Sequence, residues 1–273
     1  DFDPEEAKRH ASLSAALAPV EYDGVKLNLI DVPGLFDFEL GLYEGVQAAE
    51  SVLICVSGRS GVTVGAEKAY KMAEKQAKSR MIFISKMDLE NANFYKILEE
   101  LKAKFGPSVC PCVVPFKLDD GTTAYVNLFS QKAFKYEGGK QVQIPLPDMG
   151  HRLDGLVEAM SEAVAETDDA LMEKFFEGEP FTTDEIVEGM RIGVKTGVIT
   201  PVFCGSAVNL QALDMLLFNM KKLLPSAARA ASQVALDKDG REVEFKCDEA
   251  EPTAAYVFKT VADPSAGKLS YVK

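Results

Sequence analysis

A carboxylate, a proline and a glycine follow one short apolar run, and together they could serve a nucleotide. Residues 27–30 are mostly apolar and lead into Asp31-Val32-Pro33-Gly34. Asp31 could hold a Mg²⁺ through water, and the Gly34 N–H could approach a phosphate oxygen because no Cβ obstructs it. The pattern favours nucleotide binding or hydrolysis. A strand followed by an ordinary Pro-Gly turn is the alternative, and this motif alone does not decide between them.

Two later motifs contain the residue types that bind guanine. Ser85-Lys86-Met87-Asp88 and Gly205-Ser206-Ala207 each follow an apolar run. The Asp88 carboxylate can accept from guanine N1–H and from its 2-amino group, charge-assisted bonds worth about 1.5–3 kcal/mol each, and adenine lacks that pair of donors. The Lys86 stem can cover the base, and the N–H groups of Ser206 and Ala207 can meet guanine O6. A lone Lys-x-Asp is common, but three motifs in this order are a strong indication.

Alternating strands and helices must position these motifs. We predict strands at 51–56, 80–84 and 199–204, and the first of these is a continuous apolar run of the kind that a strand buried on both faces needs. We predict helices between and after them, at 66–78, 92–105 and 210–224. This order indicates a parallel α/β sheet, which binds ligands at the carboxyl ends of its strands. We place the strand ending at Asp31 in the same sheet, so that the three motifs share one edge.

The alternation stops at about residue 113. Strands at 113–116, 123–128 and 132–136, followed by helices to about 195, indicate an inserted α+β subdomain. We therefore assign a nucleotide-binding domain to 1–112 and 197–224 and the insert to 113–196. Residues 225–252 are predicted as a polar linker, and 253–273 as the opening hairpin of a further β domain.

Composition narrows the class of protein. The chain has 273 residues with 47% hydrophobic content, enough for a large core, and shows neither an apolar membrane span nor a signal peptide, so we expect a cytoplasmic protein without membrane contact. Five cysteines without a Cys-x-x-Cys pair and only two histidines make zinc improbable. The net charge of −12 disfavours general attraction to nucleic acid or anionic lipid, so any RNA must be met locally.

With these motifs, the chain resembles the translational GTPases, and among them elongation factor G, over nearly its whole length. Arg9-His10-Ala11-Ser12-Leu13 resembles the family's Arg-Gly-Ile-Thr-Ile switch, which implies that Ser12 reaches Mg²⁺ beside Asp31. Further matches lie in the insert and near the chain end, at Asp168-Asp169-Ala170-Leu171-Met172-Glu173-Lys174-Phe175, Phe258-Lys259-Thr260, Asp263-Pro264 and Gly267-Lys268-Leu269. The resemblance implies a P-loop-NTPase-type parallel sheet with an inserted α+β subdomain and the start of a β-barrel domain. It also implies GTP or GDP with Mg²⁺ as ligands, and a role in translation on the ribosome.

Three departures from the family pattern bear on activity. These residues contain no Gly-x-x-x-x-Gly-Lys-[Ser/Thr] phosphate loop, so we expect that this stretch alone is inactive, poorly stable and unable to hold GTP, and that a longer chain supplies the loop. Leu35 stands where the family has the His that orients the attacking water, so no catalytic residue is assigned. His10 is interpreted as a solvated loop residue rather than a substitute. Ser85 stands where the family usually has Asn, and because a hydroxyl is shorter and has fewer bonding groups than an amide, we expect weaker base affinity with the specificity kept by Asp88.

The insert carries most of the acidic charge. Residues 151–190 contain twelve Asp or Glu against two Lys or Arg. Four acidic residues recur at helical spacing opposite an apolar stripe, where like charges destabilise a helix slightly: Asp154, Glu158, Glu162 and Glu166. By resemblance this acidic face would contact the ribosomal stalk protein, with ribosomal RNA nearby. The alternative is a solvated helix face.

The leading hypothesis is the nucleotide domain of an elongation-factor-G-like, translocation-type GTPase with impaired hydrolysis. The alternatives are a non-hydrolysing pseudo-GTPase that occupies the factor site, and a ribosome-protection factor. Leu35 is the residue that distinguishes the GTPase from the pseudo-GTPase. The sequence does not predict the oligomeric state.

Overall fold

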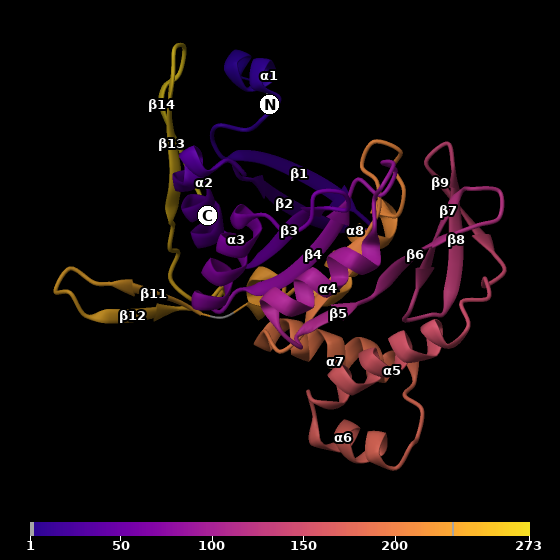
Figure 1. The fold of residues 1–273 in the computed structure, drawn as a ribbon. Helices are drawn as coiled ribbons and strands as arrows, with labels where there is room; N and C mark the ends of the chain where they lie inside the picture. The colour runs from indigo at the N-terminus through magenta and orange to yellow at the C-terminus, as the bar shows by residue number, and fades with distance from the viewer. Residues whose placement is uncertain (1–2, 231) are drawn as a thin grey trace. The chain divides into compact units, whose positions relative to one another are not determined.

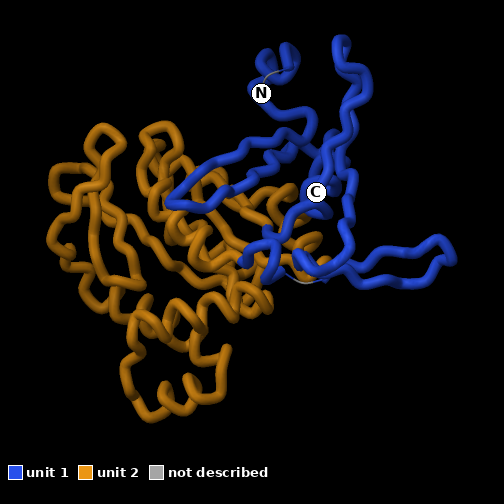
Figure 2. Tube along the Cα trace, turned by 180° about the vertical axis from the view of Figure 1, so that it is seen from behind, with its two compact units in different colours: residues 1–51, 225–273 blue, residues 52–224 orange. Residues whose placement is uncertain are grey.

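The computed structural model describes residues 3–230 and 232–273, which form two compact units (Figure 2). Unit 1 comprises residues 1–51 and 225–273, and unit 2 comprises residues 52–224. These units cut the chain differently from the predicted domains, whose boundaries stay a prediction. No helix in the described part of the chain combines the length and apolar character needed to cross a membrane.

A four-stranded sheet forms the centre of unit 2 (Figure 1). Its order is β3 (Ser51–Ser57), β4 (Ser79–Ser85), β10 (Thr200–Cys204) and β5 (Val109–Pro111). Strand β10 runs parallel to both β4 and β5. All of β10, and β4 up to its last residue, are buried, as expected for strands covered on both faces. The predicted parallel α/β sheet is confirmed.

Helices of unit 2 cover this sheet and begin at recognisable caps. Helix α3 (Val64–Lys75) packs on β4, and α4 (Phe94–Phe105) packs on β5. Asn93 caps α4 by accepting the Lys96 N–H at 3.0 Å, and the chain leaves the helix at Gly106, whose φ is +81°. Helix α8 (Leu213–Leu223) follows β10 and completes the predicted helices.

The insert is an antiparallel sheet followed by three helices. The sheet order is β6 (Val113–Lys117), β7 (Thr123–Asn127), β8 (Lys132–Glu137) and β9 (Lys140–Ile144). Strand β9 was not predicted, because its Lys-Gln-Val-Gln-Ile sequence is polar and its residues are largely exposed at the sheet edge. The helices are α5 (His151–Ala165), α6 (Asp169–Phe176) and α7 (Thr183–Thr196), of which α7 packs on β4 and β10.

Unit 1 begins with α1 (Pro4–Arg9) and a two-stranded antiparallel hairpin, β1 (Ala16–Tyr22) and β2 (Val25–Asp31). Asp23 and Gly24 turn the hairpin with φ values of 44° and 74°, as a tight Asp-Gly turn requires. The prediction that the strand ending at Asp31 belongs to the parallel sheet is wrong for the described residues, in which β2 pairs with β1 alone. Its half-exposed residues suit such a hairpin rather than a strand buried on both faces.

The rest of unit 1 contains a short 3₁₀ turn, η1 (Phe36–Phe38), helix α2 (Glu39–Ala48) and two further hairpins. Strands β13 (Val257–Asp263) and β14 (Gly267–Val272) form the hairpin predicted near the chain end. The stretch predicted as a linker holds a turn, η2 (Ala227–Arg229), and the hairpin of β11 (Gln233–Leu236) and β12 (Glu242–Phe245). Both of its strands are almost fully exposed, so the polar composition was a correct indication of solvent contact but not of missing structure.

Candidate functional site

Two of the predicted motifs meet at the carboxyl ends of β4 and β10. The Met87 N–H donates to the Gly205 carbonyl oxygen at 3.1 Å, and the Gly205 N–H donates to the Ile84 oxygen at 3.0 Å. A Cβ on Gly205 would lie 2.3 Å from the Gln211 oxygen, so only glycine fits there. The loop with Lys86 and Asp88 is therefore tied directly to the loop with Ser206 and Ala207.

The backbone of the first loop presents alternate side chains to solvent. Lys86 has a φ of +60°, in the left-handed region that few side chains adopt. Met87 is buried, whereas Lys86 and Asp88 on either side of it are exposed. Gly58 makes room for Met87, because a Cβ there would lie 2.7 Å from the Met87 sulfur. The buried methionine thus fixes the turn while the lysine and the carboxylate face outward.

Ser206 is used differently from the prediction. Its N–H donates to the Gln211 oxygen at 3.0 Å, and the Gln211 N–H returns a bond to the Ser206 oxygen at 2.8 Å. The side chain is fully buried, and its hydroxyl accepts the Asn209 N–H at 3.2 Å. The Ser206 N–H is thus already satisfied within the loop. Of the predicted pair, the exposed Ala207 has the N–H that meets no acceptor among the described residues.

Ser12 and Asp31 meet in unit 1. The Ser12 hydroxyl donates to Asp31 Oδ2 at 2.8 Å. Gly34 is exposed, its backbone is not left-handed, and a Cβ there would meet no other atom within 4 Å. Neither local packing nor backbone conformation therefore requires glycine at this position. These residues belong to unit 1, whereas Lys86, Asp88, Ser206 and Ala207 belong to unit 2, so each set is described within its own unit.

Glu6 organises the segment around Ser12, and sequence reasoning missed it. Glu6 is buried, with 3% of its surface exposed. Its carboxylate accepts the Leu13 N–H at 2.8 Å and the Ser14 N–H at 3.3 Å, so the buried charge has hydrogen-bond partners. The Leu13 N–H is the main cause that lowers the pKa of Glu6. The sequence signal was the Asp3-x-x-Glu6 capping box that starts α1.

Helix α2 holds the 31–34 turn through two glycines. A Cβ on Gly41 would lie 2.6 Å from Pro33 Cδ, and a Cβ on Gly45 would lie 2.3 Å from Val32 Cγ1. Because the two glycines are four residues apart, they share the face of α2 that packs on the turn. Close approach of helix and turn therefore depends on both missing side chains.

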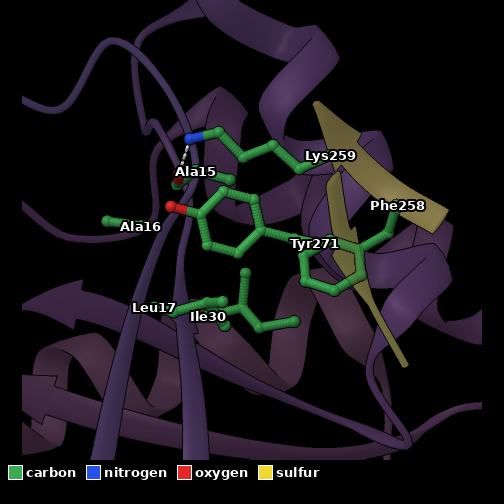
Figure 3. A pocket seen from close by; sticks show the side chains of 7 residues that line it. All are labelled: Ala15, Ala16, Leu17, Ile30, Phe258, Lys259 and Tyr271. Carbon is green, nitrogen blue, oxygen red and sulfur yellow. Dashed lines mark hydrogen bonds between the residues drawn. The ribbon is translucent and has the colours of Figure 1, made fainter. Parts of the chain in front are cut away.

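A small pocket of unit 1 lies elsewhere, between the β1–β2 hairpin and the β13–β14 hairpin (Figure 3). Its volume of about 130 Å³ is too small for a nucleotide, because ligand pockets are typically about 300–1,000 Å³. The Lys259 ammonium group donates to the Ala15 carbonyl oxygen at its rim (Figure 3). The pocket thus marks where the second hairpin contacts residues just after the switch-like segment.

Comparison with known proteins gives the same answer for the family. Residues 1–226 match the family model described as the elongation factor Tu GTP binding domain. The chain belongs to this family. It is 34% identical over 273 residues to an elongation factor G-like protein from Thermotoga maritima, covering 100% of this chain and 40% of that protein. A crystal structure of a protein from Thermus thermophilus superimposes with a TM-score of 0.85 at 27% identity, over 100% of this chain and 39% of the other.

The predicted resemblance to translational GTPases of the elongation factor G type is therefore confirmed. The chain spans about two fifths of the length of these relatives. The family is one of guanine-nucleotide-binding domains, which agrees with the arrangement of Lys86, Asp88 and Ala207.

Two of the three departures from the family pattern, Leu35 and Ser85, can be located in this GTP-binding domain. Leu35 is 48% exposed at the start of η1, and its side chain has no group that could orient water. The Ser85 hydroxyl donates to the Val56 oxygen at 3.2 Å, so it ties β4 to β3. His10 is exposed at the end of α1, with a φ of 54°, as expected for a solvated loop residue.

The acidic face of the insert lies on α5. Asp154, Glu158 and Glu162 are exposed along the helix, and exposed Glu166 caps its end. Met160 and Val164 on the opposite side are fully buried. The predicted amphipathic helix is confirmed, and the partner of its acidic face stays a prediction.

Proposed function

We propose that the complete protein binds GTP and GDP and acts on the ribosome as a translocation-type factor of the elongation factor G class. The observation that carries this proposal is the bond from the Met87 N–H to the Gly205 oxygen, which brings the Asp88 loop and the Ala207 loop together. Asp88 would accept from guanine N1–H and the 2-amino group, while the Ala207 N–H would donate to O6. Lys86, exposed beside Asp88, would cover the base.

By the family resemblance, Ser12, Asp31 and Gly34 would serve Mg²⁺ and phosphate. The Ser12 and Asp31 oxygens, 2.8 Å apart, suit Mg²⁺, which commonly takes one or two protein ligands, several waters and phosphate oxygens. When bound, Mg²⁺ would offset the phosphate charge. Gly34 would bring its N–H to a phosphate oxygen, which accounts for a glycine that neither packing nor backbone conformation requires.

Hydrolysis would be slow. Removing a group that positions water or moves a proton typically costs about 10²–10⁴ in rate, and Leu35 stands at that position. This residue also favours the second candidate function, a pseudo-GTPase that occupies the factor site on the ribosome without turnover.

The acidic face would supply one protein contact. Four carboxylates on one side of α5 suit a basic surface, and the ribosomal stalk protein is the partner that the family resemblance implies. The triple variant Glu158→Lys, Glu162→Lys, Glu166→Lys should weaken stalk-dependent ribosome binding. A matched variant reverses Glu173, Glu177 and Glu179, which are exposed outside α5, and should bind as the natural protein does.

The main test uses the complete protein and purified ribosomes. Labelled GDP should bind and be displaced by GTP but not by ATP, and a non-hydrolysable GTP analogue should raise ribosome binding above that with GDP. Ribosome binding that ignores the nucleotide would contradict the proposed factor role, even if GDP itself binds.

A further inference from the structure

The segment that joins β10 to α8, residues 205–212 (the base loop), is held in place by the inserted sheet. The Tyr125 hydroxyl on β7 donates to Gln211 Oε1 at 3.1 Å, across 86 positions of sequence. Gln211 in turn exchanges two backbone bonds with Ser206, at 2.8 and 3.0 Å. Tyr125 thus contacts the residue whose backbone fixes the position just before Ala207.

A second tyrosine holds the other end of the base loop. The Tyr136 hydroxyl on β8 donates to Asp214 at the start of α8, and it accepts from the Gln141 side-chain amide at 3.4 Å. The two tyrosine rings meet edge to face with centroids 5.9 Å apart. Burial is the main cause that raises the pKa of both Tyr125 and Tyr136, so both hydroxyl groups keep their protons at neutral pH.

The base loop also needs external support because of its backbone. Leu210 and Ala212 have φ values of 52° and 59°, in the left-handed region that non-glycine residues rarely adopt. The turn after β8 packs on Leu210, since a Cβ on Gly139 would lie 3.3 Å from its side chain. Three contacts from the insert therefore enforce a conformation that the loop alone would not favour.

We propose that Tyr125 and Tyr136 are positioning residues through which the insert sets guanine recognition. By fixing Gln211 and Asp214, they place the Ala207 N–H where guanine O6 meets it, while Asp88 reads the neighbouring N1–H and 2-amino groups of the base. This inference rests on the proposed function, and it gives the insert a role in nucleotide selectivity apart from any ribosomal contact. A merely structural role would support the fold without affecting which base atoms are read.

Three nucleotides separate these possibilities in the complete protein. 6-Thio-GDP alters only the atom that the Ala207 N–H would meet, whereas inosine diphosphate lacks the 2-amino group that Asp88 would bind. In Tyr125→Phe, loss of one hydrogen bond should weaken GDP binding about 2- to 10-fold. The preference for GDP over 6-thio-GDP should shrink, and the preference for GDP over inosine diphosphate should stay unchanged.

Two further variants control the experiment. Tyr70→Phe removes a buried tyrosine hydroxyl that bonds to Ser108 at 3.0 Å and to Thr200 at 3.4 Å, at the end of β10 opposite the base loop, and should leave both preferences unchanged. Gln211→Leu removes the same bond from its half-exposed end and should reproduce Tyr125→Phe, even if the tyrosine variant folds poorly. The double variant Tyr125→Phe, Gln211→Leu should bind GDP about as weakly as either single variant, because both substitutions remove the same hydrogen bond.

The outcomes are distinguishable. If the natural protein binds GDP and both preferences stay unchanged in Tyr125→Phe and Gln211→Leu, the inference is overturned while the proposed function stands. If the natural protein does not bind GDP, both fall.

Discussion

At the ends of β4 and β10, the motif residues follow strands that are buried almost throughout, whereas Asp31 ends a hairpin strand in which no residue is fully buried. The base-side loops are tied to each other and to the inserted sheet by hydrogen bonds of 3.0–3.1 Å. The 31–34 turn is held by the close packing of two glycines on α2, and exposed Leu35 follows it. The proposed base-reading loops of unit 2 are thus held by hydrogen bonds to one another and to the insert, whereas the 31–34 turn of unit 1 is held by close packing on α2.

The largest expected effect comes from a substitution at Asp88, in the proposed base-reading loops. Asp88→Asn removes an acceptor of two charge-assisted bonds, so GDP affinity should fall about 10²–10⁴-fold. Xanthosine diphosphate should regain affinity, because the asparagine amide can donate to the oxygen that replaces the 2-amino group. Competition binding measures both changes. Asp119→Asn, an equal charge change at an exposed turn, serves as control, and unchanged GDP binding in Asp88→Asn would contradict the assignment.

The next prediction concerns Leu35, which follows the 31–34 turn of unit 1. Leu35→His returns a group that can hold the attacking water, so single-turnover GTP hydrolysis with ribosomes should rise about 10²–10⁴-fold while GDP affinity stays unchanged. Leu40→His makes the same substitution at a leucine that is 71% exposed on α2 and should have no effect. Equal hydrolysis in the natural protein and Leu35→His would show that water positioning does not limit the rate.

A smaller effect tests how α2 holds the turn. Gly45→Ala would place a Cβ 2.3 Å from Val32 Cγ1, and such overpacking should destabilise unit 1 by about 1–3 kcal/mol. Gly155→Ala on α5 meets no atom within 4 Å and should instead add up to about 1 kcal/mol from helix propensity. Urea unfolding measures both. Stabilisation by both substitutions would mean that the turn adapts without cost.

The smallest effect concerns acid stability of the insert. The Glu185 carboxylate accepts from the Lys174 ammonium group at 2.9 Å and from Thr182, and these bonds lower its pKa to about 2. Because the folded-state pKa lies below the ordinary value, the stabilisation is present above about pH 4.5 and is lost as pH falls toward 2. Helical circular dichroism should therefore decline over that range. Glu185→Gln should lower stability at pH 7 and reduce the pH dependence, whereas the same decline in Glu185→Gln would exclude this carboxylate as its cause.

Sequence reasoning predicted the parallel sheet because strands and helices alternate along the chain, and because residues 51–56 of β3 form a continuous apolar run. It missed α2, whose Gly41 and Gly45 lower helix propensity and have their reason in contact with Pro33 and Val32. It also missed β9, whose polar residues need only their backbone to join the sheet edge. Tertiary contacts stabilise both α2 and β9, and these contacts cannot be read from the local amino-acid composition.

For the candidate site, residue types predicted the Asp88 and Ala207 loops, and the backbone then decided which N–H was free. The Ser206 N–H could not be excluded from sequence, because its bond to Gln211 depends on the left-handed conformations of Leu210 and Ala212. The sequence did not predict the roles of Tyr125 and Glu6 either. Tyr125 contacts Gln211 and Glu6 contacts Leu13 only because the fold brings these residues together. The one sequence signal for either was the capping box at Glu6.

The most direct test of the central claim measures the affinity of the complete protein for GDP and for ADP under the same conditions. Two charge-assisted bonds to Asp88 predict that GDP binds at least about 100-fold more tightly than ADP. Equal affinity for the two nucleotides would contradict a base-reading site at the ends of β4 and β10.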